Sequence, residues 1–396
     1  MRVLVFTTVF PNPAQPLHGL FVAERVRHTA DLADVHVISP VTWFRRRLVP
    51  GHEQGPPPVE YPSFYYAPGV LKSIDGLLLF LSALPTVLRL RRQFDFDLID
   101  GHFGYPDGVA AILLGQWCRR PVTVTLRGSE VEMARYRLRR AAMAWSLKRA
   151  ARVIAVSAPL ADLAVSLGVA TGRVTVIGNG VDCSRFRPVD RLDARRKLGL
   201  PDDAQLLVSV GHLARVKRFD LVVRALPAIA ASHPKLRFAI VGGAAASSGS
   251  YPAELDETIL RLNLSDRVVV TGRLTPDDVA LWLSAADLFV LASDREGSSN
   301  ALREAVACGC PVVASDVGDA RHVVSAETGV IVDPNASSAQ WTATIEAALE
   351  RRWDRAAIRA TAERFAWSDV AARVVGEWSH SIGATTPDSG MTALGR

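Results

Sequence analysis

The sequence has little cysteine, and its few thiols are not arranged for metal or disulfide chemistry. Of 396 residues only Cys118, Cys183, Cys308 and Cys310 are cysteine, with no Cys-x-x-Cys pair and no histidine cluster nearby. Neither a zinc site nor a disulfide framework is expected from this usage. We expect ordinary thiols of a cytoplasmic protein.

Long apolar runs are also missing. The most apolar stretch, Leu77–Leu88, is short and contains Ser82 and Pro85, whereas a spanning helix needs about 20 apolar residues. Met1–Phe6 is typical of a strand, without the basic start and long apolar core of a secretory signal. We therefore expect no membrane span and no leader.

Length and charge indicate two domains, one of them basic. The chain is 49% hydrophobic and 22% charged, which is enough for real cores and too long for one typical domain. Residues 1–190 hold 23 Lys and Arg against 15 Asp and Glu, and residues 191–396 hold 23 against 25. A basic half fits an anionic substrate, an anionic membrane surface or nucleic acid. Nucleic acid is the weakest of these because no recognition motif accompanies the charge.

Short runs of Val, Ile and Leu alternate with helical patterns along the whole chain. Such continuous apolar runs are typical of strands covered on both faces, and their alternation with helices predicts parallel sheets. The expected strands are Val3–Thr8, Val35–Ser39, Leu98–His102, Val122–Leu126, Val153–Val156 and Val174–Ile177, then Leu206–Val210, Arg237–Val241, Val268–Thr271, Leu288–Ala292, Val312–Ala314 and Val330–Val332.

The pattern runs twice, with a break near Asn179–Asp182. We predict an α/β protein of two Rossmann-like, doubly wound domains, residues 1–185 and 186–365, which face each other across a cleft. Residues 366–383 are expected to form a helix that packs back toward the first domain, and residues 384–396 a disordered tail. Ligands of such sheets bind beyond the carboxyl ends of the strands.

The segment Glu296-Gly-Ser-Ser-Asn-Ala-Leu-Arg-Glu304 follows the expected strand Leu288–Ala292 and opens a helical run. Ser298, Ser299 and Asn300 are good N-cap residues, so free amides and a positive dipole end meet at the mouth of a strand. That arrangement suits a diphosphate. Two glutamates beside it can accept hydrogen bonds from sugar hydroxyls. The plainer alternative is a strand, a loop and a helix with two solvated glutamates.

Several motifs together resemble the family 4 retaining glycosyltransferases of the bacterial exopolysaccharide and cell-surface glycan type, which have the GT-B fold. The resemblance covers roughly residues 1–335. It rests on Glu296-Gly-x-x-Asn-x-x-x-Glu304-Ala-x-Ala-Cys-Gly-x-Pro311-Val-Val, Gly211-His-Leu-x-x-x-Lys217, Thr271-Gly272-Arg273, Val156-Ser157, Ile177-Gly-Asn179-Gly180-Val-Asp182-x-x-x-Phe186, Asp100-Gly-His102-Phe-x-x-Pro-Asp107-Gly108 and Leu126-Arg-Gly128-Ser-Glu130.

On the donor side the resemblance implies that Glu304 binds ribose hydroxyls and Glu296 contacts the donor hexose. It implies that Lys217 neutralises the departing diphosphate, which lowers the barrier electrostatically, and that Arg273 borders the base. The backbone amides that would hold sugar and diphosphate follow Gly297 and belong to Ser298, Ser299, Asn300, Ala301 and Leu302.

One position departs from the family. An Arg usually follows the glycine, five residues before the lysine, and this chain has His212 there. A second phosphate clamp would then come from Arg215, from Arg218 or from a protonated His212. We expect Lys217 to remain essential.

On the acceptor side, Gly19 follows a proline-rich loop, where a glycine lets backbone approach a phosphate; a plain loop turn is the alternative. His102 ends a strand, and the family's matching histidine commonly contacts the donor sugar, so we expect a catalytic role. Arg127 and Glu130 follow the next strand and are candidates for acceptor contact.

No metal site is expected. Asp95-Phe96-Asp97 matches the Asp-x-Asp metal signature of another glycosyltransferase fold, but it precedes a strand instead of following one. No other carboxylate cluster is typical of Mg²⁺. We expect no cofactor and a nucleoside diphosphate sugar as donor.

Arginines alternate with aromatic and apolar residues in two places, Arg135–Arg152 and Arg45–Arg47 after Trp43-Phe44. Such runs are usually solvated faces, yet this pattern also fits peripheral binding to anionic lipid. The predicted protein is a metal-independent, retaining hexosyltransferase of the cytoplasm or the inner face of the membrane, with a polysaccharide or lipid-linked acceptor. A nucleotide-sugar epimerase of the same fold and a non-catalytic nucleotide-sugar-binding subunit remain alternatives.

Overall fold

The computed structural model describes residues 1–53, 55–66, 69, 71–245 and 248–383. It divides into two compact units, Met1–Asn179 with Trp367–Arg396 (unit 1) and Gly180–Ala366 (unit 2). The first boundary between the units follows Asn179, six residues before the boundary expected after residue 185. Val181 belongs to unit 2 because its amide donates a hydrogen bond to the Phe365 carbonyl and it pairs with Ala366. The tail expected at 384–396 lies outside the described residues.

Unit 1 is built on a sheet of the order β10-β9-β8-β7-β1-β2-β5-β4, in which only the β4–β5 pair is antiparallel. Two further strands, β3 and β6, pair separately. The strands are β1 (Arg2–Phe6), β2 (Asp34–Ile38), β3 (Val41–Thr42), β4 (His52–Glu53), β5 (Val59–Glu60), β6 (Ser63–Phe64), β7 (Leu98–His102), β8 (Val122–Leu126), β9 (Arg152–Ala155) and β10 (Val174–Val176).

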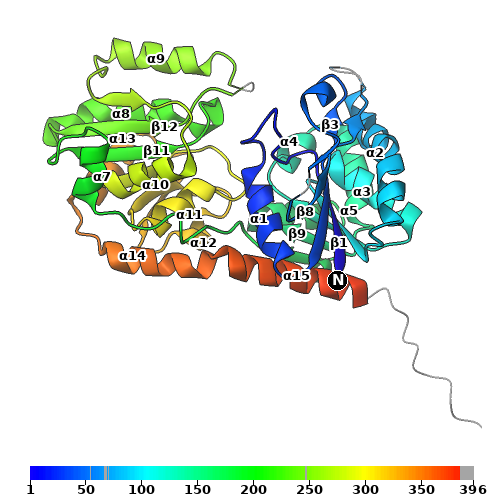
Figure 1. Cartoon of the computed structure of the whole chain (residues 1–396). Coiled ribbons are helices and arrows are strands. Elements are labelled where there is room, and N and C mark those ends of the chain that lie inside the picture. Colours follow the sequence, from blue (N-terminus) through cyan, green and yellow to red (C-terminus); the bar gives the residue numbers. More distant parts are fainter. Residues whose placement is uncertain (54, 67–68, 70, 246–247, 384–396) are drawn as a thin grey trace, which may run out of the picture. The chain divides into compact units, whose positions relative to one another are not determined.

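Helices cover both faces of this sheet, as Figure 1 shows. Alternate residues of β1 serve the two faces: Leu4 and Phe6 join the core under α2, α3 and α5, while Val3 and Val5 join the core under α1 and α15. The helices are α1 (Leu20–Ala30), α2 (Asp75–Arg91), α3 (Asp107–Cys118), α4 (Glu130–Met133), α5 (Arg137–Leu147), α6 (Ala158–Ser166) and α15 (Trp367–Gly383), with short 3₁₀ turns η1 (Arg46–Leu48), η2 (Lys72–Ile74) and η3 (Thr171–Arg173).

The last described helix, α15, completes unit 1. It packs along α1 and buries Trp367, Val374 and Trp378 against it and the sheet. Glu377 of α15 accepts hydrogen bonds from Arg152 (2.6 Å) and Thr175 (3.0 Å) on two strands of the same unit.

Unit 2 has a six-stranded parallel sheet of the order β13-β12-β11-β14-β15-β16. Its strands are β11 (Gln205–Val210), β12 (Leu236–Val241), β13 (Val268–Val270), β14 (Leu288–Leu291), β15 (Val312–Ser315) and β16 (Gly329–Val332). Its helices are α7 (Arg191–Lys197), α8 (Phe219–Ser232), α9 (Tyr251–Arg261), α10 (Pro276–Ala285), α11 (Asn300–Ala307), α12 (Ala320–Val323), α13 (Ser338–Glu350) and α14 (Arg355–Thr361), with turns η4 (Arg215–Lys217) and η5 (Ala362–Phe365).

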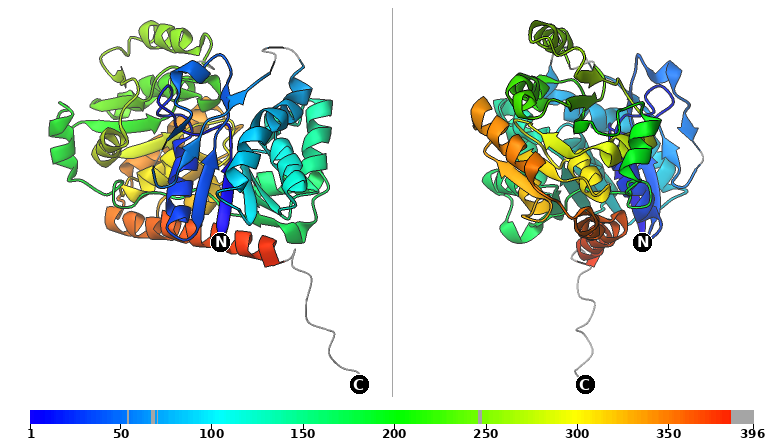
Figure 2. Two further views of the ribbon diagram at one scale, coloured as in Figure 1. Left: turned by 45° about the vertical axis from the view of Figure 1, so that its right-hand side comes forward. Right: turned by 90° about the vertical axis from the view of Figure 1, so that its left-hand side faces the viewer.

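The two faces of this sheet again bury alternate residues. Leu206 and Val208 of β11 face α7, α10 and α11, whereas Leu207 faces α8 and α13. Helix α9, drawn at the top in Figures 1 and 2, packs on α8 through Tyr251 and Leu255.

All the strands expected from the sequence are present, with ends that differ by at most two residues. The short strands β3 to β6 were not expected, because two-residue strands carry no periodicity. Ser82 and Pro85 do not interrupt α2, and η2 with α2 forms a helical stretch, Lys72–Arg91, that is long and apolar enough by length and composition to cross a membrane.

Candidate functional site

The strand order of unit 2 reverses between β11 and β14. Because all six strands are parallel, the loops that follow them meet at one edge, and such a reversal is where doubly wound sheets bind ligands. The loop after β11 leads through Gly211 and His212 to η4, and the loop after β14 runs from Ser293 to Ser299. Both loops carry residues of the predicted donor site.

Lys217 and Glu296 are brought together by these two loops. Lys217 Nζ donates to Glu296 Oε1 at 2.6 Å, and the Ser293 hydroxyl donates to the same oxygen at 2.7 Å. The lysine side chain is 21% exposed and the glutamate 13%, so the pair is partly shielded from water. The two residues to which the sequence gives separate roles form one ion pair.

Helix α11 starts beside this pair. Ser299 is its N-cap and accepts a hydrogen bond from the Leu302 amide at 3.4 Å. The Ser299 amide itself donates to Asp319 at 3.3 Å. Of the predicted anion-binding amides, those of Ser299 and Leu302 therefore already have partners.

Two buried residues that the sequence analysis did not select hold this helix start. Arg303 is fully buried and donates to the Ser298 hydroxyl (2.9 Å), to the Ser299 carbonyl (3.2 Å) and to Asp319. Asp319 also accepts from the Ser298 hydroxyl at 2.8 Å. The sequence could have pointed to Asp319 through its position alone. Asp319 lies in the loop after β15, which meets the loops after β11 and β14 at the same edge of the sheet.

The loop after β15, which contains Gly318, closely approaches the backbone of the loop after β14. Gly318 has φ of 61°, and a Cβ there would stand 2.8 Å from the Gly297 carbonyl oxygen and 2.9 Å from that of Glu296. Only glycine fits this position without displacing the segment that carries Glu296.

Glu304 lies on α11, half-buried, and its carboxyl group has no hydrogen-bond or ion-pair partner among the described residues. Burial raises its pKa to about 7. A shielded carboxyl group without a protein partner is costly to keep ionised, and such groups gather at functional sites.

His212 and Arg273 lie near Lys217. Burial lowers the pKa of His212, and the charges of Arg273 and Lys217 lower it further. These effects favour the neutral imidazole, whereas a phosphate clamp needs the protonated one, and the role of His212 toward phosphate stays a prediction. Arg273 donates one hydrogen bond, to the Ala244 carbonyl at 3.1 Å, and its side chain is otherwise exposed.

The other two candidates for that clamp have their own partners. Arg215 binds both carboxylate oxygens of Glu254 at 2.7 Å. Arg218 pairs with Asp294 at 3.0 Å and donates to the Pro334 carbonyl at 2.7 Å. Lys217 is thus the cation of η4 that lies against Glu296.

In unit 1 the strand order reverses at β1 and β7. Gly19 precedes α1 with φ of 75°, and a Cβ there would stand 2.6 Å from the Val9 carbonyl oxygen. The glycine is therefore required by the loop itself. Asp107, the first residue of α3 after β7, binds the loop after β1: its carboxyl group accepts hydrogen bonds from the Thr8 amide (2.7 Å) and the Thr8 hydroxyl (2.9 Å). Burial raises the pKa of Asp107 to about 7.

His102 is fully buried at the end of β7, and both of its ring nitrogens are engaged. Arg127 Nε lies 3.2 Å from Nδ1, and Asp100 Oδ2 lies 3.1 Å from Nε2. Burial and the charge of Arg127 lower the pKa of His102 to about 3, against the opposing effect of Asp100. The imidazole is a neutral link in a protein network, and this arrangement leaves it no nitrogen for a substrate.

Arg127 and Glu130 are also tied into the protein. Arg127 contacts His102, donates to Asn179 at 3.0 Å and lies over the Phe21 ring. The fully buried Glu130 carboxylate accepts from the amides of Gly104 (2.9 Å), Arg127 (3.1 Å) and Gly128 (2.7 Å). Glu130 therefore holds two loops of unit 1 together, and its contact with an acceptor stays a prediction.

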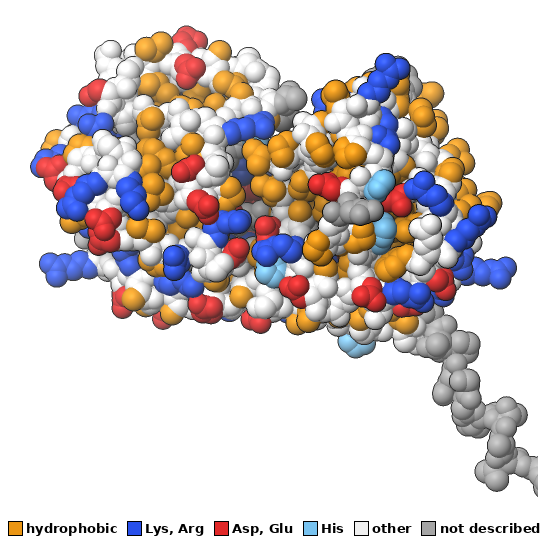
Figure 3. All heavy atoms as spheres, viewed as in Figure 1, with side chains coloured by type: hydrophobic (Ala, Val, Ile, Leu, Met, Phe, Trp, Pro, Cys, Tyr) orange, Lys and Arg blue, Asp and Glu red, His pale blue; other side chains and the backbone are white. Residues whose placement is uncertain are grey.

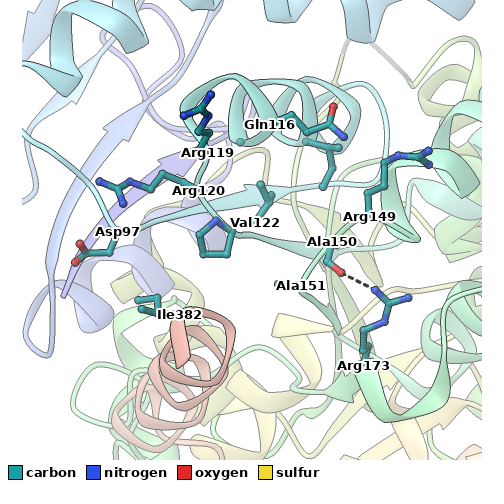
Figure 4. Close-up of a pocket in the computed structure, with 13 residues that line it drawn as sticks. Asp97, Gln116, Arg119, Arg120, Val122, Arg149, Ala150, Ala151, Arg173 and Ile382 are labelled. Atoms are coloured by element: carbon teal, nitrogen blue, oxygen red, sulfur yellow. Dashed lines mark hydrogen bonds between the residues drawn. The ribbon is translucent and has the colours of Figure 1, made fainter. Parts of the chain in front are cut away.

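A pocket of about 580 Å³ lies in unit 1 but on the other edge of the sheet (Figure 4). Asp97, Pro121, Ala151 and Arg173 line it, and each stands just before a strand. Ligands of doubly wound sheets bind at the carboxyl ends, so this pocket is not the predicted site.

Asp95 and Asp97 are not joined in a metal site. Asp95 binds Arg120 at 2.9 Å, and Asp97 accepts from the Arg2 amide at 2.8 Å. Within the described part of the chain, no group of three His, Cys, Asp or Glu side chains is placed to hold a metal, and the four cysteines are unpaired.

Comparison with known proteins identifies the family. Residues 18–185 match the family model "Glycosyltransferase Family 4", and residues 190–365 match "Glycosyl transferases group 1". TuaC of Bacillus subtilis, named for a glycosyltransferase of teichuronic acid biosynthesis, is 30% identical over 89% of this chain and 90% of its own length. A D-inositol 3-phosphate glycosyltransferase of Thermobispora bispora is 35% identical over 53% of this chain. The chain spans about half the length of that relative (51%).

Solved structures share the fold. Anabaena Alr3699/HepE, solved with UDP, superposes with a TM-score of 0.77 at 22% identity, over 96% of this chain and all of its own. A sucrose-phosphate synthase of Thermosynechococcus elongatus gives 0.79 at 22% identity, over 97% of this chain and all of its own. The chain therefore belongs to glycosyltransferase family 4 and has the GT-B fold of two Rossmann-like domains.

Proposed function

We propose that this protein transfers a hexose, with retention of configuration and without a metal, from a nucleoside diphosphate sugar to a hydroxyl group. The observation that carries the proposal is Glu304, a shielded carboxyl group without a protein partner, on the helix that starts beside Lys217 and Glu296. A carboxylate in that position is suited to a vicinal diol such as the ribose hydroxyls. The structural neighbour Anabaena Alr3699/HepE was solved with UDP and with UDP-glucose.

In the proposed donor complex, the diphosphate lies at the start of α11 and draws the Lys217 ammonium toward it. Positive charge placed where negative charge develops stabilises the transition state. Glu296, released from part of its ion pair, then accepts hydrogen bonds from the hexose hydroxyls. Ser293 still holds one of its oxygens at 2.7 Å and keeps the carboxylate oriented.

The reaction itself needs no protein nucleophile. Glu296, the carboxylate beside the start of α11, is already held by Lys217 and Ser293. The acceptor oxygen attacks the anomeric carbon on the face that the diphosphate leaves. As the bond to the phosphate oxygen breaks, that phosphate takes the acceptor's proton. The products are a glycoside with retained configuration and a nucleoside diphosphate.

We place the acceptor on a polysaccharide or a lipid-linked glycan and the protein in the cytoplasm, at the inner face of the membrane. This proposal is supported by the names of two kinds of relative, TuaC for teichuronic acid biosynthesis and the others for D-inositol 3-phosphate.

A thermal-shift screen of nucleotide sugars tests the donor, since a ligand of the folded state raises the unfolding temperature. The best donor is then incubated with EDTA and candidate acceptors, and the anomeric configuration of the product is read by NMR. A retained glycoside formed in EDTA supports the proposal. An inverted product, dependence on metal, or interconversion of the sugar nucleotide without a glycoside would contradict it.

A further inference from the structure

The pocket at the amino edge of the unit 1 sheet, called the edge pocket below, is rich in positive charge. Of the described residues that line it, Arg119, Arg120, Arg149 and Arg173 are basic, and Asp97 is the one acidic residue. Figure 4 shows Arg119 and Arg120 on one side of the pocket and Arg149 and Arg173 on the other. On the face drawn in Figure 3, by contrast, blue and red side chains are interspersed.

Helix ends account for part of this charge. Helices α3 and α5 both end at this edge, and each helix end carries a partial negative charge of about half an elementary charge. Arg149 donates to the Trp145 carbonyl at 3.1 Å, and Arg173 donates to the Ala150 carbonyl at 3.2 Å. Two helix ends and Asp97 together offset about two positive charges, so the four arginines leave an excess of about two.

Arg119 is not used to cap a helix. Its guanidinium is exposed and has no hydrogen-bond or ion-pair partner among the described residues. Its backbone, at the C-cap of α3, has φ of 54°, which is the left-handed region where glycine is favoured. An arginine therefore stands where the backbone alone favours glycine, and this indicates that its side chain has a task of its own.

Arg120 also has unused hydrogen-bonding capacity. Its Nη2 donates to Asp95 at 2.9 Å, but its Nε is buried and lacks a hydrogen-bond partner within the described part of the chain. Asp95 is also contacted by Arg91 at 3.6 Å, so this carboxylate is shared between two cations. A buried N–H group without a partner is costly, and an oxyanion in the pocket would supply the acceptor that it lacks.

The edge pocket has the size and the lining of a small-molecule site. Its volume of about 580 Å³ lies within the roughly 300 to 1,000 Å³ typical of ligand pockets. Guanidinium groups bind phosphate oxygens in pairs. The pocket therefore combines a phosphate-binding rim with an apolar part, whose residues include Ile112, Val122, Ala150, Ala151 and Ile382.

We propose that the edge pocket binds the oligophosphate chain of a small molecule. An excess of about two positive charges fits two or more phosphate groups. Such a chain occurs free, as in inorganic tripolyphosphate, and in nucleotides, and the apolar lining favours the nucleotide. The site is separate from the donor site, because its residues precede strands of unit 1, whereas Lys217 and Glu304 belong to unit 2.

The test is calorimetric titration of the whole chain with inorganic tripolyphosphate and with ATP, at low salt. The parent protein carries Lys217→Ala, which removes the cation of the donor site, so that the heat reports the edge pocket. Adding Arg119→Gly is expected to weaken binding of both probes by about tenfold, and Arg149→Met in addition by about 100-fold in total. Tighter binding of ATP than of tripolyphosphate would identify a nucleotide, and equal binding would identify the phosphate chain as the whole recognised group.

Loss of folding cannot explain the expected result for Arg119→Gly. Because glycine is favoured at this φ, the variant should keep the unfolding temperature of the parent or raise it. The matched control is Arg137→Ala, which removes an exposed arginine at the other end of α5 and should leave binding unchanged.

Two results would overturn the proposal: no binding of either probe up to about 1 mM, or equal binding by the parent and the Arg119→Gly protein. Glycosyl transfer is measured separately, with Lys217 intact. The edge pocket and the proposed function can therefore fail independently.

Discussion

Lys217 Nζ and Glu296 Oε1 lie 2.6 Å apart, so the cation and the anion of the predicted donor site neutralise each other before any substrate binds. An ion pair of this kind keeps both partly shielded side chains in place. It also means that a diphosphate must compete with Glu296 for the ammonium group. Binding of donor and rearrangement of this pair are therefore expected to be one event.

Lys217→Ala should lower turnover at saturating donor by at least about 100-fold, because the leaving diphosphate loses its nearest cation. Steady-state kinetics at several donor concentrations separate this effect from a change in KM. Arg215→Ala is the matched control on the same turn, since Arg215 is exposed and bound to Glu254. Near-normal turnover in Lys217→Ala would remove the leaving-group role.

Glu304→Gln should stabilise the free protein at pH 8 and weaken nucleotide binding. Burial raises the pKa of Glu304 to about 7 in the fold, above the ordinary glutamate pKa of 4.5. The folded state therefore holds a proton that the unfolded state releases, so this group's contribution is complete below about pH 4.5 and disappears as the pH rises through 7.

We expect the variant to gain about 1–2 kcal/mol at pH 8, measured by urea unfolding, and to lose at least about tenfold in affinity for a nucleoside diphosphate, measured by calorimetry. Wild-type affinity in Glu304→Gln would show that the carboxyl group does not bind the ligand.

His102 should stay neutral throughout the physiological range. Burial, with the charge of Arg127, lowers its pKa to about 3. A lowered histidine pKa means that the unfolded state binds the extra proton, so this contribution to stability is present above about pH 6.5 and is lost as the pH falls toward 3. NMR of the labelled imidazole should show no titration between about pH 5 and 9. A midpoint near 6.5 would mean that the network with Arg127 is open in solution.

Glu130→Gln should lower stability more than activity per folded molecule. The carboxylate accepts three backbone amides, at 2.7 to 3.1 Å, in a fully buried position. Loss of this charge-assisted acceptor should cost about 2–3 kcal/mol in urea unfolding. Glu132→Gln, two residues on, is the control, because Glu132 pairs with the exposed Arg135. Unchanged stability with lost activity would restore the acceptor role expected from the sequence.

The fold was readable from the sequence because the central strands are buried on both faces and therefore continuously apolar. Val3–Phe6 and Leu206–Val208 show this pattern, and both are strands at the centres of their sheets. Parallel strands also put the segments that follow them at one edge, so the neighbourhood of Lys217 and Glu296 could be predicted. Their direct pairing could not, because it depends on side-chain reach across two loops.

The polar network of unit 1 was less predictable. His102, Arg127 and Glu130 each follow a strand, and position alone does not distinguish a residue that faces a ligand from one that binds the neighbouring loop. Burial decides between them, and burial depends on how Phe21 and Asn179, far away in the sequence, cover Arg127. The same limit explains why Arg303 was overlooked: an arginine in the first turns of a helix is usually solvated.

Arg303 offers the last test, because it separates loop position from overall stability. Arg303→Met leaves Asp319 buried without its cation, and breaking such a pair should cost about 3–5 kcal/mol. Adding Asp319→Asn removes the uncompensated charge and should recover part of that loss in urea unfolding. Nucleotide affinity should stay low in both variants, since Ser298 and Ser299 have lost the guanidinium that holds the start of α11. If affinity returned together with stability, the start of α11 would not need this anchor to bind the diphosphate.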